Sequence, residues 1–448
     1  SQSFLSSIKI ELQKPETADP VSKIYYTKDG STPTSSSSVY TGALTLTKTT
    51  PLIARLIHPN GGMGPVGSET YFCLQRSLTN VSSNLPLIVL ENYGSGRPPQ
   101  GDYQTASMAV IEPADGRSRL TSPFAAASQV GIKVRGSSTS GRSKASLSLE
   151  VQDEFGQDRN LSLLGMPNES DWVLWGPYNF DLTLMHNPFI FELSRQIGRY
   201  APRTRFVELY LNTGGGALSS SDYYGVYALM EKISRDADRV DVERLFGEHK
   251  QEPDVSGGYI FKIDRADPGD SGFSGANQSI KYVYPKEVEI EQPERDAQQQ
   301  YVRRFFNEMG TALNASYFKN PTRGYAKYID VDAAIDHHLL NVLAFNVDAL
   351  RLSGYMHKPR GGKLTFGPIW DFDRALGSTD GRDNNPRTWR STSSDRGTDF
   401  FNYPWWKRMF KDIDFFQKYI DRFQSLRRAE FSKANINTII DGMANELK

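Results

Sequence analysis

The apolar residues of this chain change their spacing about two thirds of the way along it. Up to residue 290 most of them alternate with polar residues, as in GIKVR and TRFVELYLN, which is typical of strands. Later they recur at helical spacing, as in QQYVRRFFNEMGTAL, and Asp330 is placed to cap the helix of DVDAAIDHHLL. The spacing predicts an α+β fold in which a β-rich portion, about 79–290, precedes a helix-rich portion, about 291–448.

One helix is expected inside the β-rich portion. Asn187 is followed by Pro188, a favoured pair at a helix start, and Ile190, Leu193 and Ile197 then lie on one face. We therefore predict that Asn187 caps this helix.

The first 78 residues have a composition of their own. They are rich in Ser, Thr and β-branched residues, and Asp29-Gly30 is a strong turn signal between alternating segments. LTLTKTTPLIARLI is typical of two short strands joined by a Thr-rich corner. We expect residues 1–78 to form a small β-sandwich, separate from a larger domain over 79–448.

Charge and cysteine content exclude several kinds of partner and site. The 52 basic and 52 acidic residues balance, so no global field attracts nucleic acid, and we expect no nucleic-acid partner. Cys73 is the only cysteine, which rules out a disulfide framework and a cysteine-ligated structural zinc. No run approaches the roughly 20 apolar residues of a membrane span, so we expect no span.

The stretch IWDFDRALGS places two aspartates, Asp371 and Asp373, directly after apolar residues. Carboxylates beside a core are costly to bury unless they are paired or bind a cation. Asp348 stands at the other end of a predicted hairpin that has a Gly-Gly turn, and a hairpin brings its two ends together. Asp348 and Asp371 are therefore expected to face one cavity. Such a pair suits magnesium-dependent phosphoryl transfer, in which one carboxylate orients the attacking hydroxyl and the other holds the metal.

Some of the candidate residues have two explanations. Asp373 either binds the metal or caps, or pairs with, the segment that starts at Arg374. In GIKVRGSSTSGRSKASLSLEV a loop of Gly, Ser and basic residues separates two strands, with Arg135 before the loop and Lys144 after it. This loop either closes over phosphates, through backbone N–H groups and the lysine, or is an exposed polar hairpin.

From about residue 80 to its end the chain resembles the CotH family, the spore-coat-protein-H type of atypical protein kinase. The resemblance rests on motifs in family order: GIKVRGSSTSGRSK, DWVLWGPYNFDLTLMHNPF, GRYAPRTRFVELYLN, YYGVYALMEKI, GGYIFKID, NVDALRLSGYMHK and GPIWDFDRALGS. It implies a kinase-like, two-lobed fold that transfers phosphate from ATP to serine residues with magnesium or another divalent ion.

The resemblance also implies roles for single residues. Asp348 matches the catalytic-loop aspartate, Asp371 matches the metal-binding aspartate, and Lys144 matches a lysine expected to meet nucleotide phosphates. Arg135 and Glu231 are expected to be neighbours in the nucleotide site.

Two of these positions leave an alternative open. Ser353 stands where kinases and spore-coat members tend to place a metal-binding asparagine. A hydroxyl is a weaker magnesium ligand than an amide carbonyl, so Ser353 is a metal candidate that puts metal affinity and activity in question. Glu231 either lies near the adenine or the phosphate-binding lysine, or forms a surface ion pair with Lys232.

The segments YYTKDGSTPT, VYTG and LTKTT within residues 1–78 resemble the chitobiase/β-hexosaminidase C-terminal type of domain, an immunoglobulin-like accessory module. Its tyrosines either pack the sandwich or bind sugar, because a shared fold does not establish a function.

These observations predict an atypical protein kinase that transfers the γ-phosphate of ATP to serine or threonine hydroxyls of a protein substrate, with Mg²⁺ or Mn²⁺. We expect a secreted or cell-surface bacterial protein whose β-module contacts a glycan or another surface partner. The alternative is a non-catalytic, kinase-like scaffold or binding protein, attached to a surface or glycan through the β-module.

Overall fold

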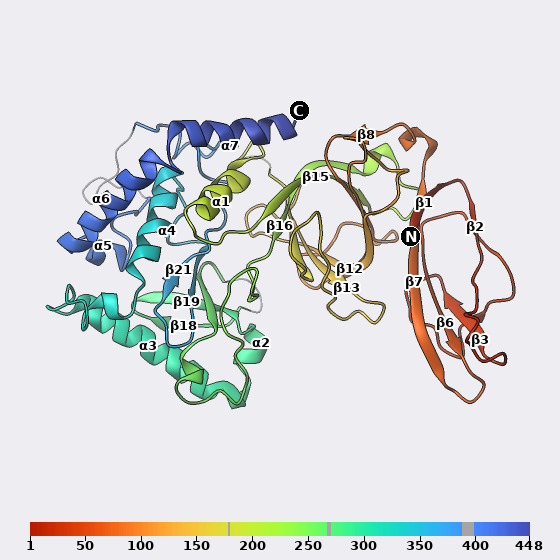
Figure 1. Cartoon of the computed structure of the whole chain (residues 1–448), viewed down its shortest axis with the longest axis horizontal. Helices are drawn as coiled ribbons and strands as arrows, with labels where there is room; N and C mark the ends of the chain where they lie inside the picture. The colour runs from red at the N-terminus through yellow and green to blue at the C-terminus, as the bar shows by residue number, and fades with distance from the viewer. Residues whose placement is uncertain (178–179, 267–269, 388–397) are drawn as a thin grey trace. The chain divides into compact units, whose positions relative to one another are not determined.

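A computed structural model describes the chain except for residues 178–179, 267–269 and 388–397 (Figure 1). Contacts divide the chain into two units that are interleaved along the sequence. The first unit comprises Ser1–Gly176, Thr204–Met230 and Glu446–Lys448, and the second comprises Pro177–Arg203 and Glu231–Asn445. Strands build the first unit, and a sheet with helices builds the second, so the predicted α+β class is confirmed.

The first strands of the chain form two packed sheets. The larger sheet has the order β1-β7-β6-β3-β4, with the bounds Gln2–Leu5, Met63–Leu74, Thr50–Ile57, Lys23–Thr27 and Ser38–Val39. The smaller sheet pairs β2 (Ile8–Ile10) with β5 (Leu44–Leu46). Apolar side chains from both sheets share one core, which includes Phe4, Ile10, Leu46, Leu52 and Cys73. LTLTKTTPLIARLI thus forms β5 and β6, as its alternation predicts.

The rest of the first unit is a closed barrel. Its strands follow the order β10-β12-β13-β14-β16-β15-β9, with the bounds Gln104–Ile111, Ala126–Val134, Leu147–Gln152, Asp171–Trp175, Tyr223–Glu231, Thr204–Asn212 and Leu87–Glu91. Strands β9 and β15 pair in parallel and thereby join segments far apart in the sequence. Two short strands, β8 (Ser82–Ser83) and β11 (Ser118–Arg119), pair beside it, and the unit also has the turns η1 (Arg76–Leu78) and η2 (Ser220–Asp222).

The second unit is organised around a five-stranded antiparallel sheet of order β18-β19-β17-β20-β21. The strands span Gly272–Gly275, Gln278–Tyr284, Tyr259–Ile263, Gly354–Lys358 and Thr365–Phe366. Strands β20 and β21 form the hairpin that the sequence predicts before Asp371, with Met356 opposite Phe366.

Helices complete the second unit. They are α1 (His186–Gln196), α2 (Glu287–Ile290), α3 (Asp296–Asn314), α4 (Val331–Leu343), α5 (Trp406–Met409), α6 (Ile413–Arg428) and α7 (Lys433–Glu446), with the short turns η3 (Asp254–Ser256), η4 (Pro293–Arg295) and η5 (Tyr325–Lys327). Phe306 of α3 lies edge-on to Phe261 of β17, with 5.3 Å between ring centroids. Helices α4 and α6 lie side by side (Figure 1), and His338 Nδ1 is 2.9 Å from the hydroxyl of Tyr419. Among the described residues, none of the helices has the length and apolarity needed to cross a membrane.

The local sequence predicts the start of one helix correctly and that of another wrongly. The side chain of Asp330 accepts a hydrogen bond from the Ala333 N–H and caps α4, as predicted. Helix α1 instead begins at His186, so the prediction that Asn187 caps it is wrong. Asn187 is buried inside the first turn, where its side chain bonds to a distant segment.

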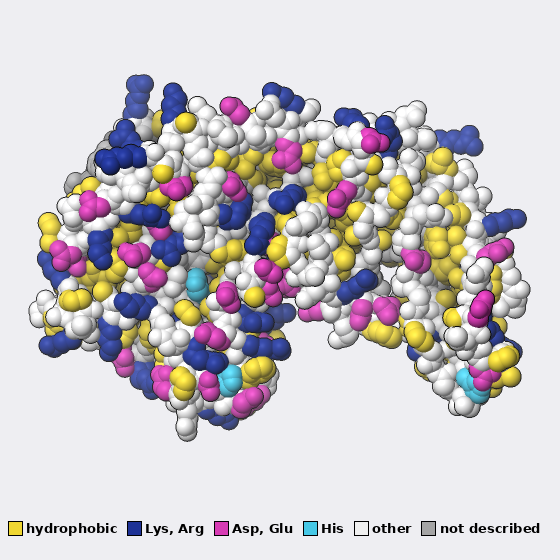
Figure 2. Space-filling view, viewed as in Figure 1, with side chains coloured by type: hydrophobic (Ala, Val, Ile, Leu, Met, Phe, Trp, Pro, Cys, Tyr) yellow, Lys and Arg dark blue, Asp and Glu magenta, His cyan; other side chains and the backbone are white. Residues whose placement is uncertain are grey.

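Basic and acidic side chains are interspersed on the face drawn in Figure 2, in keeping with the balance of 52 and 52 charged residues. Any charged binding surface must therefore come from a local group of side chains.

Candidate functional site

Three oxygen-bearing side chains meet at the open end of the β20-β21 hairpin. Ser353 directly precedes β20, Asp371 follows β21 closely, and Asp264 follows β17, the strand that pairs with β20. The Ser353 Oγ lies 3.3 Å from Asp264 Oδ2 and 3.5 Å from Asp371 Oδ2. The hairpin thus brings its two ends together, as the sequence predicts, and the side chains that meet there are those of Ser353 and Asp371.

Asp373 lies half-buried beside this group. Loss of water contact, followed by the negative charge of Asp371, raises the pKa of the Asp373 carboxyl to about 8. Asp348 adds to the rise, and Arg374 opposes it. Burial also raises the pKa of Asp264. Carboxylates crowded in this way favour a bound cation, because it lowers the cost of keeping them ionised.

The donor set fits a magnesium ion held jointly with a substrate. Mg²⁺ prefers carboxylate and other hard oxygen ligands, and proteins commonly hold it with one or two carboxylates plus substrate phosphates. In the described part of the chain, no group of three or more His, Cys, Asp or Glu side chains is arranged to hold a metal ion. Asp264, Asp371 and the Ser353 hydroxyl therefore supply part of a coordination shell, which phosphate oxygens would have to complete.

Asp348 has different surroundings, because arginines hold its carboxylate. Its Oδ1 lies 3.1 Å from Arg351 Nη2 and 3.3 Å from Arg382 Nη2, and its Oδ2 lies 3.8 Å from Arg374 Nη1. Asp380 in turn lies 3.4 Å from the Arg374 guanidinium. Asp348 is thus fixed in position and surrounded by positive charge.

The backbone around these residues is unusual. Ser353 and Asp371 have φ angles of 51° and 64°, and Leu350 has a φ of 69°. Few residues other than glycine adopt this left-handed region, and a bulky side chain does so only where the surrounding structure enforces it. Strain of this kind concentrates at functional sites, which agrees with the gathering of carboxylates here.

The first turn of α1 holds the aspartate segment in place. The Asn187 side-chain oxygen accepts the Phe372 N–H at 2.7 Å, between the two aspartates, and His186 Nδ1 lies 3.3 Å from the Asp373 carbonyl oxygen. Buried Asp181 accepts the backbone N–H of His186 at 2.9 Å. Asp181, His186 and Asn187 of the motif DWVLWGPYNFDLTLMHNPF thus support the site.

Glu231 is fully buried at the end of β16. It accepts hydrogen bonds from the Arg203 N–H at 2.8 Å, from Arg203 Nη1 at 2.7 Å and from the Tyr200 hydroxyl at 3.2 Å. A surface ion pair with Lys232 is therefore the wrong explanation for Glu231, because its carboxylate is buried and held by Arg203.

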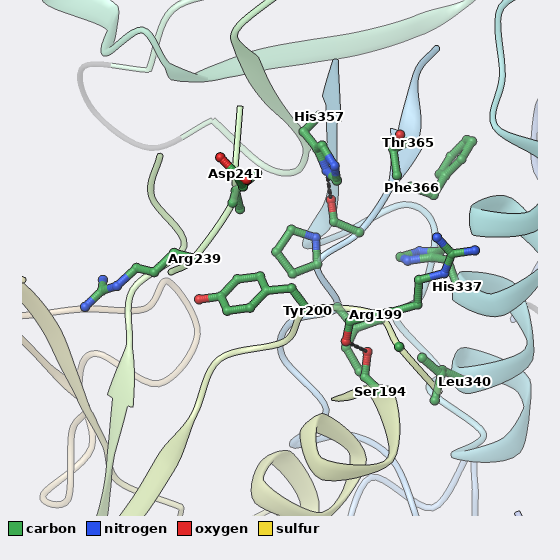
Figure 3. Close-up of a pocket in the computed structure, with 15 residues that line it drawn as sticks. Ser194, Arg199, Tyr200, Arg239, Asp241, His337, Leu340, His357, Thr365 and Phe366 are labelled. Atoms are coloured by element: carbon green, nitrogen blue, oxygen red, sulfur yellow. Dashed lines mark hydrogen bonds between the residues drawn. The ribbon is translucent and has the colours of Figure 1, made fainter. Parts of the chain in front are cut away.

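Tyr200 also lines a cavity of about 250 Å³ in the second unit. Figure 3 shows Arg239 and Asp241 on one side of it, His337 and Leu340 on the other, and Tyr200 between them. His337 is 5 % exposed, and no described residue is a hydrogen-bond partner for its Nδ1. The wall continues through Thr365 to Ile369, which lead directly to the aspartate segment.

Arg135 and Lys144 belong to the first unit, where they flank the loop between β12 and β13. The Arg135 N–H donates to the Ser146 carbonyl oxygen at 2.9 Å, and the Lys144 Nζ lies 5.1 Å from the centre of the Tyr227 ring. The loop between two strands is present as predicted, and the choice between a phosphate loop and a polar hairpin stays a prediction.

Asp264 is the site residue that sequence reasoning missed. It was part of the predicted segment GGYIFKID, which ends in a carboxylate directly after a buried strand. Asp371 was predicted from the same pattern, a carboxylate that follows apolar residues. That pattern could therefore also have identified Asp264.

Comparison with known proteins agrees with this architecture. The model of the CotH kinase protein family matches residues 132–448, which is more than half of the chain, and that of the chitobiase/beta-hexosaminidase C-terminal domain matches residues 1–68. No curated protein matches the chain. The chain therefore belongs to the CotH kinase protein family, with a chitobiase/beta-hexosaminidase C-terminal domain over residues 1–68.

Proposed function

We propose that the protein is an ATP-dependent protein kinase that phosphorylates serine or threonine hydroxyls. Membership of the CotH kinase protein family supports a kinase-like function in general. The observation that carries the specific proposal is the group of Asp264, Ser353 and Asp371 oxygens beside Asp373, whose pKa is raised to about 8. Such a group favours a divalent cation and, through it, nucleotide phosphates.

In this proposal the site residues have two roles, metal binding and proton acceptance. Asp371 and Asp264 would hold Mg²⁺ or Mn²⁺, with Ser353 and Asp373 beside them, and the bound ion supplies neutralisation of phosphate charge. Asp348 accepts the proton of the acceptor hydroxyl, and Arg351, Arg374 and Arg382 fix its orientation.

The nucleotide needs two further contacts. The cavity beside Tyr200 takes the base, because it offers ring faces and the unpaired Nδ1 of His337 to a planar, hydrogen-bonding group. Lys144 and Arg135, which flank the loop between β12 and β13, are the predicted phosphate contacts. Glu231 keeps Tyr200 in place through the hydrogen bond from the Tyr200 hydroxyl.

The acceptor and the location follow from the same hypothesis. The acceptor is a protein with exposed serine or threonine residues, and we place the enzyme outside a bacterial cell, secreted or at its surface. The chitobiase/beta-hexosaminidase C-terminal domain would attach it to a glycan or another surface partner.

Transfer of labelled γ-phosphate tests the proposal. The protein is incubated with γ-labelled ATP in Mg²⁺ or Mn²⁺, alone and with a generic acidic or basic acceptor protein. We expect label on serine or threonine, and none when a chelator removes the metal. Absence of label under every metal condition would reject the kinase activity.

A non-catalytic scaffold is the second candidate. It is favoured by the three arginines that engage Asp348, because a carboxylate already paired is a poorer proton acceptor, and by the hydroxyl of Ser353 in place of an amide. Thermal unfolding separates the two candidates. A ligand at about 100 times its Kd stabilises by roughly 2.7 kcal/mol, so an ATP shift without transfer indicates a nucleotide-binding scaffold.

A further inference from the structure

Helix α3 and the segment that follows it line a basic groove in the second unit. Its cavity measures about 550 Å³, and its lining includes Arg303, Arg304, Glu308, Tyr317, Arg323 and Tyr328. None of these residues belongs to the aspartate site or to the cavity beside Tyr200. We call these six residues the α3 groove.

The three arginines of the α3 groove are held by aromatic rings. The Arg323 guanidinium lies 4.5 Å from the centre of the Tyr317 ring. Those of Arg304 and Arg303 lie 5.5 Å and 5.6 Å from the rings of Tyr301 and Phe273. A guanidinium over a ring is attracted by the ring face, and each of these groups has five N–H donors with which it can bind an anion.

None of these arginines forms an ion pair with a described residue. Within the described part of the chain, no carboxylate lies within 4.0 Å of Arg303, Arg304 or Arg323. The one acidic residue of the groove, Glu308, accepts a hydrogen bond from the Tyr328 hydroxyl at 3.4 Å. Three arginines and a single carboxylate therefore line one cavity.

We propose that the α3 groove binds a phosphorylated serine or threonine side chain of a polypeptide. A phosphate monoester carries a charge of about −1.5 to −2 at neutral pH and three terminal acceptor oxygens. This matches the surplus of positive charge in the groove and provides an acceptor for more than one guanidinium fork. A single carboxylate has one unit of charge and fills one fork, so it fits less well. The proposal stands apart from the proposed transfer reaction, since binding needs neither ATP nor metal.

The stacking also argues against a nucleic acid as the ligand. Single-stranded nucleic acids bind through bases stacked on open aromatic rings. Here basic side chains lie over the rings, including Lys327 Nζ, 5.0 Å from the centre of the Tyr328 ring. The basic side chains that line the groove suit phosphate oxygens rather than bases.

Binding of labelled peptides to the whole chain tests the proposal. Four probes are compared by fluorescence anisotropy: a phosphoserine peptide, the same peptide with serine, the same peptide with glutamate, and a single-stranded RNA of similar length. We expect the phosphoserine peptide to bind at least tenfold more tightly than the serine and glutamate peptides. Equal affinity for the three peptides, or tighter binding of the RNA, would overturn the proposal.

Variants assign the binding to the groove. Arg304→Ala combined with Arg323→Ala should weaken phosphoserine binding at least tenfold, and Arg323→Lys alone should weaken it less, since lysine keeps the charge without the fork. Arg244→Ala is the matched control, because Arg244 is exposed and its guanidinium lies 5.0 Å from the Phe246 ring outside the groove. Far-ultraviolet circular dichroism checks each fold. If Arg244→Ala weakens binding as much as the double variant does, general charge and not the groove binds the peptide.

Discussion

Asp348 and Asp371 carry the same functional group in different surroundings, and we expect those surroundings to separate their roles. Asp371 faces the hydroxyl of Ser353 and raises the pKa of Asp373, whereas Asp348 is held by Arg351, Arg374 and Arg382. A cation favours crowded carboxylates over one that arginines already neutralise. The metal should therefore depend on Asp371, and the chemical step on Asp348.

Replacing each aspartate by asparagine tests this separation. Asp371→Asn should abolish the thermal stabilisation by ATP with Mg²⁺, since an amide lacks the anionic oxygen a hard cation requires. Asp348→Asn should keep nucleotide binding and lower transfer more than tenfold, about 1.4 kcal/mol of barrier. Calorimetric ATP affinity and phosphate transfer are measured for both variants at one metal concentration. Equal loss of ATP binding in both variants would mean that Asp348 also holds the metal.

At the scale of elements, α1 acts as a support for the aspartate segment. Its buried Asn187 accepts the Phe372 N–H, and Asp181 holds the start of the helix by accepting the His186 N–H. Asn187-Pro188 has the local features of a helix start, yet the helix begins one residue earlier. The Asn187 side chain instead accepts a hydrogen bond from Phe372, which is far away in the sequence. The spacing of residues around Asn187 does not predict such a tertiary contact.

Asn187→Ala tests how much this support contributes to the stability of the second unit and to binding of ATP with Mg²⁺. The Phe372 N–H would lose its acceptor in a buried place, which typically costs about 1–3 kcal/mol. We expect the second unit to unfold at lower denaturant concentration, and ATP with Mg²⁺ to give a smaller thermal shift because Asp371 and Asp373 lose their fixed spacing. Asn435→Ala is the control, since Asn435 bonds to Gln196 at 2.6 Å outside the site. Equal behaviour of the two variants would contradict a supporting role for Asn187.

The contrast between local patterns and tertiary contacts also explains which elements can be predicted from the sequence. Alternation and helical spacing predict β5, β6, α3 and α4, because each of these elements carries its own buried face. Closure of the barrel depends on the pairing of β9 with β15, which no local pattern encodes. For the site, the hairpin predicts that its two ends meet, since the chain itself joins them, and Ser353 and Asp371 lie at these ends. The engagement of Asp348 by Arg374 and Arg382, which are distant from it in the sequence, required the folded structure.

At the scale of the whole molecule, Glu91 in the first unit and His337 in the second are buried titratable groups whose contributions to stability respond oppositely to pH. Burial raises the pKa of Glu91 in the first unit to about 7, from an ordinary 4.5. Burial lowers the pKa of His337 in the second unit to about 3, from an ordinary 6.5. Glu91 therefore contributes stability below pH 4.5 that is lost as the pH rises through 7. His337 contributes stability above pH 6.5 that is lost as the pH falls towards 3.

Lowering the pH from 7 to 5 should thus stabilise the first unit through Glu91 and remove stability from the second unit through His337. In the second unit Asp373, whose pKa is raised to about 8, opposes His337, because its carboxyl contributes stability at low pH that is lost as the pH rises through 8. Each contribution changes by at most about 1.4 kcal/mol per pH unit. Hydrogen exchange with mass spectrometry, corrected for intrinsic rates, reports peptides of β9 and β15 separately from those of α4. Glu91→Gln should flatten the response of the first unit alone. His337→Phe should shift the response of the second unit alone, so that this unit is more stable at pH 5, relative to pH 7, than in the unsubstituted protein. An unchanged response of the substituted unit in either variant would contradict the assignment.

The interleaving of the two units has a consequence for biosynthesis. A ribosome releases the sandwich strands first, and their core is complete once Leu74 has emerged. The barrel has to wait, because β15 and β16 follow Pro177–Arg203, a segment of the other unit. During that interval β14 and β9 are open strand edges, which tend to pair with other chains. While residues 177–203 are being synthesised, the nascent chain therefore exposes these two strand edges, and at this stage we expect a chaperone to be needed most.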